Sequence, residues 1–182
     1  MLGSLYCCVR TQDILEHGLF GPAEALAERR RCTDRAVVLD QFQGDRQLGR
    51  TVTAGFSLSV EPPTFLVSIA EHSDLAQMIR AIGRFSVATL SETQRDVADA
   101  FAGKSLPEDR FRSGRWQTWD SGMPILMEAV TSMDCAVVTQ MTLHGHVLFA
   151  GAVNELTFGN TGRPLVWHHR RYNTVHPFPS GG

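Results

Sequence analysis

The sequence lacks the short motifs that mark several large enzyme classes. It has no Walker loop, no GxGxxG pattern after a strand, no GxSxG elbow and no HExxH pair. Phosphate-cradling loops, Rossmann dinucleotide sites and zinc-protease helices need those residue types at those spacings. The acidic residues are scattered, so no pair of carboxylates for acid–base catalysis stands out. These absences argue against a P-loop ATPase, a Rossmann dehydrogenase and a zincin.

Cysteine is also scarce. The four cysteines are Cys7, Cys8, Cys32 and Cys135, and no two of them form a CxxC pair. We therefore expect no disulfide framework and a reducing, cytoplasmic location. Adjacent Cys7 and Cys8 fit a redox or metal-binding role, but their terminal position favours an incidental one.

The chain has little excess charge and no long apolar run. Lys104 is the only lysine, and the formal net charge of -2 argues against a nucleic-acid binder. No apolar stretch approaches the ~18–20 residues that cross a bilayer, and the first residues lack a signal-peptide pattern. The sequence therefore predicts neither a nucleic-acid partner nor a membrane association.

The 182 residues are enough for one domain, with 43% apolar residues to build its core. Residues 1–22 show weak periodicity and are predicted to form a poorly ordered N-terminal extension. Residues 23–178 are predicted to form a single domain, because no repeat or long linker divides them.

Strand-like and helix-like segments alternate along this domain. Helices are predicted over 23–31, over 74–82 after a Ser73 cap, and from a capping box at 91–94 through Phe101. Residues 103–124 are predicted to be irregular. Strands are predicted at 36–39, from Leu48, and at 51–60, 64–70, 85–90, 133–142, 147–158 and 165–167. The strands are mostly close neighbours in sequence, which favours an antiparallel barrel with peripheral helices over a doubly wound sheet.

Hydroxyl residues recur on one side of the predicted strand 51–60. Thr51, Thr53, Ser57 and Ser59 share this side, and hydroxyls with free backbone N–H groups at a strand end bind phosphate oxygens. Alternatively, these residues cover the solvent face of an amphipathic strand, which the stripe alone favours.

Two further groups of residues are candidates for chemistry. His144 and His146 lie two residues apart at a hairpin, but no acidic or cysteine partner is spaced with them, so no metal site is predicted. A histidine beside an anionic, redox-active ligand fits better, since imidazole ionises near neutral pH. Arg170, Arg171 and Tyr172 suit the phosphates and ring of a dinucleotide, or else form a solvated turn.

Taken together, these segments resemble the short-chain flavin reductase family, the reductase components of two-component flavin-dependent monooxygenases. The resemblance covers about residues 24–175 and is carried by several motifs in register. They comprise Gly49, Thr51, Ser57, Ser59, Pro62 and Pro63, then residues 83–90, Gln94, residues 98–103, residues 122–124, Cys135, His146, Arg171 and Tyr172.

This resemblance implies an FMN-binding split barrel that acts as a homodimer, with flavin and NAD(P)H near the subunit interface. It places His146 beside the nicotinamide, and Arg171 and Tyr172 at the dinucleotide. The residues that it implies for flavin binding are Thr51, Val52, Thr53, Ala54, Ser57, Ser68, Ile69, Ala70, Ser73, Ala88 and Thr89.

The chain departs from the family pattern at Ala54, Gly55 and Ala88, where the family often has Ser, Phe and Asn. The loss of polar side chains at Ala54 and Ala88 lowers the expected flavin affinity. The expected function is hydride transfer from NADH or NADPH to FMN, or to FAD, for delivery to a partner oxygenase. The alternatives are a flavin carrier without turnover, and a reductase of another bound cofactor such as a corrin.

Overall fold

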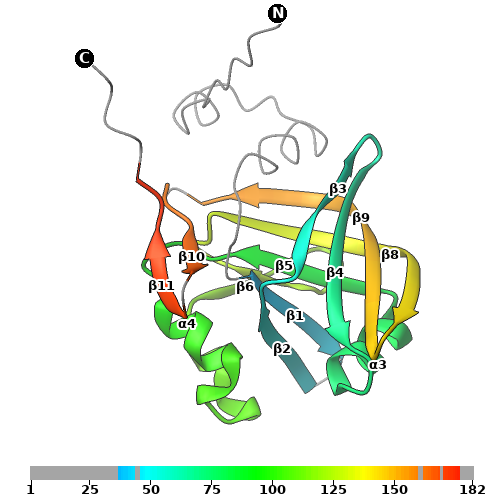
Figure 1. Cartoon of the computed structure of the whole chain (residues 1–182), viewed down its shortest axis with the longest axis horizontal. Helices are drawn as coiled ribbons and strands as arrows, with labels where there is room; N and C mark the ends of the chain where they lie inside the picture. The colour runs from blue at the N-terminus through cyan, green and yellow to red at the C-terminus, as the bar shows by residue number, and fades with distance from the viewer. Residues whose placement is uncertain (1–36, 44–45, 160–161, 169, 177–182) are drawn as a thin grey trace, which may run out of the picture.

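The computed structural model describes residues 37–43, 46–159, 162–168 and 170–176 (Figure 1). The predicted extension 1–22, its boundary, the predicted helix over 23–31 and three of the four cysteines lie outside this range. Among the described residues, no helix has both the length and the apolar character needed to cross a membrane.

The described domain is built on one seven-stranded antiparallel sheet with the order β2-β1-β5-β8-β9-β4-β3. Its end strands β2 and β3 follow one another in the chain but do not pair, so the sheet curls around a core and stays open along one seam. The predicted antiparallel split barrel with peripheral helices is confirmed. The strands are β1 Val37–Gln43, β2 Arg46–Val52, β3 Gly55–Val60, β4 Pro63–Ala70, β5 Arg84–Thr89, β8 Thr131–Leu143 and β9 His146–Phe158.

The seam corrects one prediction. The alternating segment 51–60 was expected to form a single strand, but β2 ends at Val52 and β3 begins at Gly55. The chain leaves one edge of the sheet and enters the opposite edge within this segment, so it cannot stay extended. Thr53 and Ala54 form the crossing, which we call the seam loop. Alternation of residue types carries no signal for such a break.

The long hairpin β8–β9, predicted as two apolar-rich strands joined by a tight turn, lies in the middle of the sheet. His144 and Gly145 make its turn with positive φ angles of 47° and 75°. Within β9, Gly151 lies against the core, where an added Cβ would come 2.7 Å from Phe85 Cζ and 2.9 Å from Cys135 Cβ. Only glycine fits there without displacing its neighbours.

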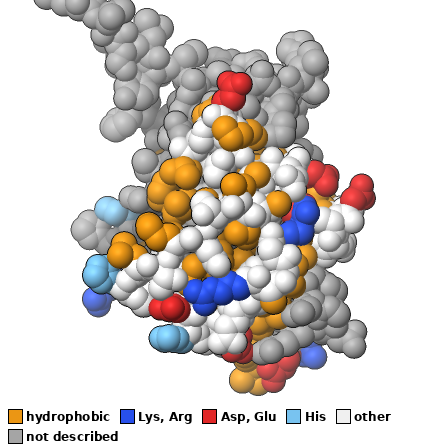
Figure 2. Space-filling model, turned by 90° about the vertical axis from the view of Figure 1, so that its right-hand side faces the viewer, with side chains coloured by type: hydrophobic (Ala, Val, Ile, Leu, Met, Phe, Trp, Pro, Cys, Tyr) orange, Lys and Arg blue, Asp and Glu red, His pale blue; other side chains and the backbone are white. Residues whose placement is uncertain are grey.

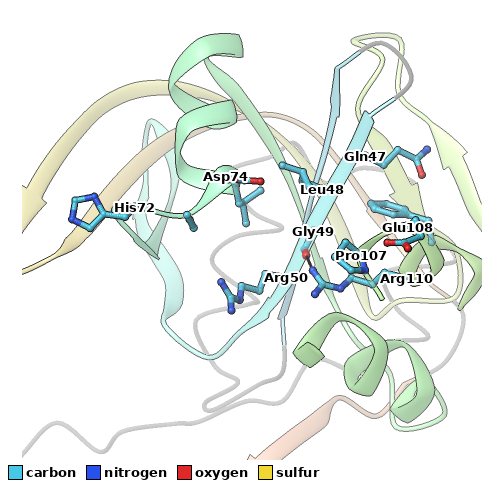
Figure 3. Close-up of a pocket in the computed structure, with 12 residues that line it drawn as sticks. Gln47, Leu48, Gly49, Arg50, His72, Asp74, Pro107, Glu108 and Arg110 are labelled. Atoms are coloured by element: carbon cyan, nitrogen blue, oxygen red, sulfur yellow. Dashed lines mark hydrogen bonds between the residues drawn. The ribbon is translucent and has the colours of Figure 1, made fainter. Parts of the chain in front are cut away.

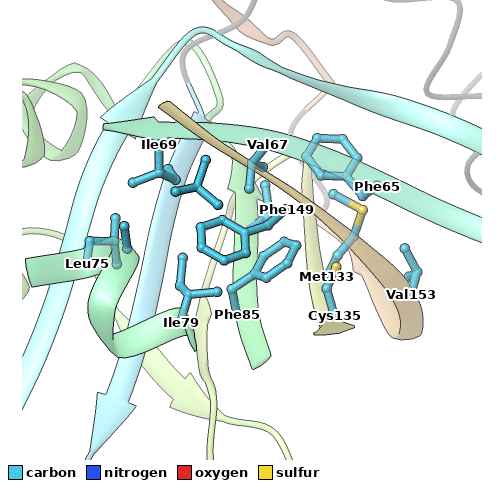
Figure 4. Packing of buried hydrophobic residues seen from close by; sticks show 13 residues of the cluster. Phe65, Val67, Ile69, Leu75, Ile79, Phe85, Met133, Cys135, Phe149 and Val153 are labelled. Carbon is cyan, nitrogen blue, oxygen red and sulfur yellow. The ribbon is translucent and has the colours of Figure 1, made fainter. Parts of the chain in front are cut away.

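The main core lies between the curled sheet and helix α3, Asp74–Ile82 (Figure 4). Ser73 caps α3 as predicted, since its Oγ accepts a hydrogen bond from the Ala76 amide at 3.2 Å. Gly83 ends the helix with a left-handed φ of 72°. The buried side chains of this cluster include Phe65, Val67, Ile69, Leu75, Ile79, Phe85, Met133, Cys135, Phe149 and Val153.

A second apolar cluster lies on the other side of β5. The predicted helix after the capping box forms as α4, Arg95–Asp99, and continues as the π-helical turn η1, Ala100–Lys104. The segment predicted to be irregular holds three short elements, because tertiary packing orders stretches too short to show periodicity. They are the 3-10 helix η2 Pro107–Arg112, β6 Trp116–Thr118 and β7 Pro124–Leu126. A C-terminal hairpin of β10 Leu165–His168 and β11 Arg171–Thr174 completes the fold; its second strand was not predicted.

Candidate functional site

Four of the residues implied by the family resemblance meet on one side of the sheet. The Ser68 amide donates to the Ala54 carbonyl at 3.0 Å, which ties the seam loop to β4. Two residues further along β4, Ala70 faces His146 across the β4–β9 pairing. Strand alternation puts Ser68, Ala70 and His146 on the same face, the one that points away from the core. The structure thus brings the implied flavin wall and the implied nicotinamide residue together.

The same face is strongly apolar. Register places Phe56 of β3, Leu66 of β4, Leu148 of β9, and Met141 and Leu143 of β8 on it, and we call this surface the outer face. Phe56 and Met141 are each 55% exposed. Figure 2, which views the right-hand side of Figure 1, shows hydrophobic side chains spread over that side of the molecule, with charged side chains among them and at its edges.

The hydroxyl stripe lies differently from what alternation alone suggests. Ser57 and Ser59 are half-buried, while the apolar residues Phe56 and Leu58 of the same strand are exposed. Ser59 Oγ donates to the Glu61 carbonyl at 3.0 Å. The simple alternative of a solvent-facing hydroxyl side is therefore wrong for β3, since it is the apolar side that faces outward.

Thr51 and Ser73 already use their hydroxyls within the protein. Thr51 Oγ1 donates to the Ala98 carbonyl at 2.8 Å, which fixes the end of β2 onto α4. Ser73 Oγ donates to the Ala70 carbonyl at 2.7 Å and accepts from Ala76. These two hydroxyls are therefore engaged within the protein, whereas Thr53 and Ala54 of the seam loop are exposed.

Three of the other implied residues are buried. Ile69 belongs to the main core, and Ala88 lies in the second apolar cluster with 1% exposure. Thr89 is fully buried and accepts a hydrogen bond from Thr131 Oγ1 at 3.0 Å. Their direct contact with a flavin stays a prediction. Val52 packs partly buried against the main core.

The C-terminal hairpin is tied to α4 beside Thr51. The Tyr172 hydroxyl donates to Asp99 Oδ1 at 2.7 Å, and Lys104 Nζ donates to Asp99 Oδ2 at 2.7 Å. Burial would raise the pKa of Asp99, but the hydrogen bonds from Lys104 and Tyr172 outweigh it and lower that pKa. Burial and the hydrogen bond to Asp99 raise the pKa of Tyr172.

The ring of Tyr172 packs edge-on against Trp167, with 4.8 Å between the ring centroids. Arg171 is exposed on the same hairpin. Tyr172 thus has a structural role, while the Arg171 side chain forms no hydrogen bond or ion pair with the other described residues and is the more exposed member of the implied pair.

A cavity that the sequence did not indicate opens beside the edge strand β2 (Figure 3). Arg50 and Arg110 both line it. They come from segments far apart in the sequence, so no local sequence motif could predict that they lie in one cavity. Among the described residues, no group of three or more His, Cys, Asp or Glu side chains is placed to hold a metal ion.

Comparison with known proteins now identifies the family. Residues 30–176 match the family described as flavin reductase like domain. The chain belongs to this family. It is 36% identical over 132 residues to the "FADH(2)-dependent resorcinol hydroxylase, reductase component" of Rhizobium sp. (strain MTP-10005), over 72% of this chain and 74% of that protein.

Two further flavin reductases are similar to the chain. The "FMN reductase (NADH) RutF" of Ancylobacter novellus is 36% identical over 134 residues, covering 73% of this chain and 74% of that protein. The styrene monooxygenase flavin reductase of Pseudomonas putida S12 has a solved structure that matches with a TM-score of 0.70 and 26% identity, over 81% and 93% of the two chains. The resemblance based on sequence motifs is confirmed, and so is the fold.

Proposed function

We infer that this chain is an NAD(P)H-dependent flavin reductase that supplies reduced flavin to a partner monooxygenase. The observation that carries this inference is the position of His146 opposite Ala70, on the face where Ser68 meets the seam loop. Membership of the flavin reductase family, and relatives named as an NADH-dependent FMN reductase and as a hydroxylase reductase component, support it.

The residues of the outer face fit a flavin as an extended ligand. A bound flavin supplies the hydride-accepting ring, so the protein needs no acid–base pair of its own. Exposed backbone groups of Thr53 and Ala54 hold the phosphate and ribityl end, while Ser68 and Ala70 form the wall beside the ring. The exposed imidazole of His146 orients the nicotinamide against that wall, and this alignment is the chain's contribution to catalysis.

The departures from the family pattern suit a flavin that is released. Ala54 presents no hydroxyl, and Ala88 lies buried among apolar side chains. An added Cβ at Gly55 would lie 3.3 Å from the Phe65 ring, so a larger residue there requires Phe65 to move. Each absent hydrogen bond removes about 0.5–1.5 kcal/mol of binding free energy. Flavin therefore acts as an exchangeable substrate that leaves reduced, as delivery to an oxygenase requires.

A second copy of the chain covers the outer face in this proposal. Exposed apolar patches of this kind mark interaction surfaces, and most soluble oligomers are two-fold symmetric. In β3 the serines turn inward, whereas Phe56 and Leu58 are exposed. Burial of these two apolar side chains by a partner subunit explains why they face outward. The homodimer then places His146 and Ala70 at the subunit interface. The cytoplasm, where NADH is available, is the proposed location.

The test is NADH oxidation by the purified protein, followed at 340 nm, with no flavin, with FMN and with FAD. A reductase oxidises NADH only when flavin is supplied, and the reduced flavin appears in the filtrate after rapid ultrafiltration under anaerobic conditions. Flavin that binds without any NADH oxidation would establish the carrier instead. No binding and no oxidation would leave the family fold without this activity.

A further inference from the structure

The cavity beside β2 is enclosed by three separate parts of the chain. Residues 47–50 of β2, residues 72–75 at the start of α3, and residues of η2 line a space of about 620 Å³. This volume is within the ~300–1,000 Å³ of typical small-molecule sites. The cavity adjoins the proposed flavin site, because Arg50 directly precedes Thr51 and Ser73 belongs to both.

The carboxylates of Asp74 and Glu108 line this cavity, but among the described residues neither Arg50 nor Arg110 forms an ion pair with a carboxylate. Figure 3 shows Arg50 and Arg110 on either side of Gly49, and both line the cavity. Arg110 Nη1 donates to the Gly49 carbonyl at 3.1 Å, and its Nε is buried without a partner in the described part of the chain. Within that part Arg50 forms no ion pair or side-chain hydrogen bond. Carboxylates pair with Arg80, Arg84, Arg112 and Arg115, so Arg50 and Arg110 belong to the arginines without an ion pair in the described part of the chain, and the cavity brings these two together.

The remaining lining adds the other groups that a nucleotide needs. Leu48 and Pro107 present apolar surface, and the exposed carboxylate of Glu108 accepts hydrogen bonds. Carboxylates bind the hydroxyls of an unphosphorylated ribose, while arginines bind phosphate oxygens. The cavity therefore combines phosphate donors, a ribose acceptor and an apolar wall.

We propose that this cavity binds the adenosine diphosphate half of a dinucleotide, with the diphosphate on Arg50 and Arg110 and the ribose at Glu108. The proposal rests on the proposed flavin reductase function, and FAD and NADH are the two dinucleotides in that reaction. FAD has the more direct path: its adenylate joins at the flavin phosphate, and the seam loop proposed to hold that phosphate follows Arg50 in the chain.

The experiment compares wild type, Arg50→Gln and Arg112→Gln. Arg50 is exposed, so its replacement leaves the core intact, and Arg112 provides a matched loss of charge on η2 outside the cavity lining. ADP binding is measured by calorimetry, and KM is measured for FMN, FAD and NADH. We expect Arg50→Gln to weaken ADP binding about tenfold, or about 1.4 kcal/mol, and Arg112→Gln to leave it unchanged.

The substrate constants identify the dinucleotide. A rise in KM for FAD alone, with FMN and NADH unchanged, assigns the cavity to the adenylate of FAD. A rise in KM for NADH with either flavin assigns it to NADH. Equal rises for FMN and FAD would overturn the proposal, because Arg50 would then bind the flavin phosphate itself. Failure of wild type to bind ADP would also overturn it, and calorimetry shows this even if the protein does not oxidise NADH.

Discussion

Tyr172 donates its phenolic hydrogen to Asp99 across 2.7 Å, and this bond fastens the C-terminal hairpin to helix α4. The neighbouring residue of α4, Ala98, accepts the hydroxyl of Thr51 from the end of β2. The end of β2 and the C-terminal hairpin are thus anchored at successive positions of one short helix. Disturbing α4 is expected to affect the seam loop and the hairpin together.

Replacement of Tyr172 by Phe removes this anchor and keeps the ring. Because hydrogen bonds to charged groups contribute about 1.5–3 kcal/mol when well shielded, and this one is only partly buried, we expect a loss of about 1–2 kcal/mol in unfolding free energy. Urea denaturation measures the loss. Val175→Ala, directly after the same strand and 51% exposed, is the control. If KM for NADH rises while stability holds, Tyr172 contacts the dinucleotide instead.

The same pair predicts how stability depends on pH. The pKa of Asp99 is lowered from 3.8 by Lys104 and Tyr172 in spite of burial, so its contribution is present above pH 3.8 and is lost as the pH falls through the lower folded value. Burial raises the pKa of Tyr172 from 10.0, so its contribution is present below pH 10.0 and is lost as the pH rises above it.

The stability difference between wild type and Tyr172→Phe should therefore be constant from about pH 5 to 9 and shrink on both sides. Urea denaturation at a series of pH values provides this difference directly. A difference that stays constant up to pH 12 would contradict the raised pKa of Tyr172.

Replacement of Gly151 by Ala tests the packing at the centre of the sheet. The added Cβ would meet Phe85 at 2.7 Å and Cys135 at 2.9 Å, and overpacking of this kind costs about 1–3 kcal/mol. Gly162→Ala is the matched control, since no heavy atom lies within 4 Å of its added Cβ. If urea denaturation gives the two variants equal stability, the side chains of Phe85 and Cys135 shift to accommodate the added methyl group at little cost in free energy, which would contradict this prediction.

The sequence predicted the parts of the fold whose signals are local. Helix α3 follows from the Ser73 cap and its apolar spacing, and the β8–β9 hairpin follows from two long apolar runs around Gly145. The break at the seam loop was not predictable, because it depends on where the distant edge of the sheet lies. The short elements β6 and β7 owe their order to packing against the second cluster, which no window of the sequence contains.

The candidate site shows the same division. Family motifs pointed to Ser68, Ala70 and His146, and the structure places these residues on one face. The motifs could not reveal that the Thr51 hydroxyl donates a hydrogen bond to the Ala98 carbonyl, since the two residues are 47 positions apart in the chain. Arg50 carries no motif, and that it has no ion-pair partner among the described residues becomes visible only once the charges around it are placed.

The outer face gives a prediction about assembly. Met141→Glu puts a charge where we propose that a second copy packs, and a buried unpaired charge strongly disfavours association. We expect wild type to be a dimer by multi-angle light scattering at micromolar concentration, and this variant to be a folded monomer by circular dichroism. The control is Gln77→Glu on the exposed side of α3. A monomeric wild type would remove the dimer from the proposed function.

His146 distinguishes a reductase from a carrier. His146→Ala should raise KM for NADH or slow hydride transfer about tenfold, near 1.4 kcal/mol, because the imidazole no longer orients the nicotinamide. Flavin affinity should change little, since the seam loop holds the other end of the flavin. The control is His144→Asn, because His144 has a φ of 47° that asparagine tolerates, and its side chain lies at the tip of the turn.

Stopped-flow reduction under anaerobic conditions separates the two histidines, and light scattering checks that both variants keep the assembly of the wild type. The imidazole of His146 is exposed, so its loss leaves the core intact and any slowing reports on the nicotinamide. If the two substitutions slow hydride transfer by the same small factor, His146 does not orient the nicotinamide. The seam loop and Ser68 would then remain as a flavin-binding wall without an assigned partner for NADH.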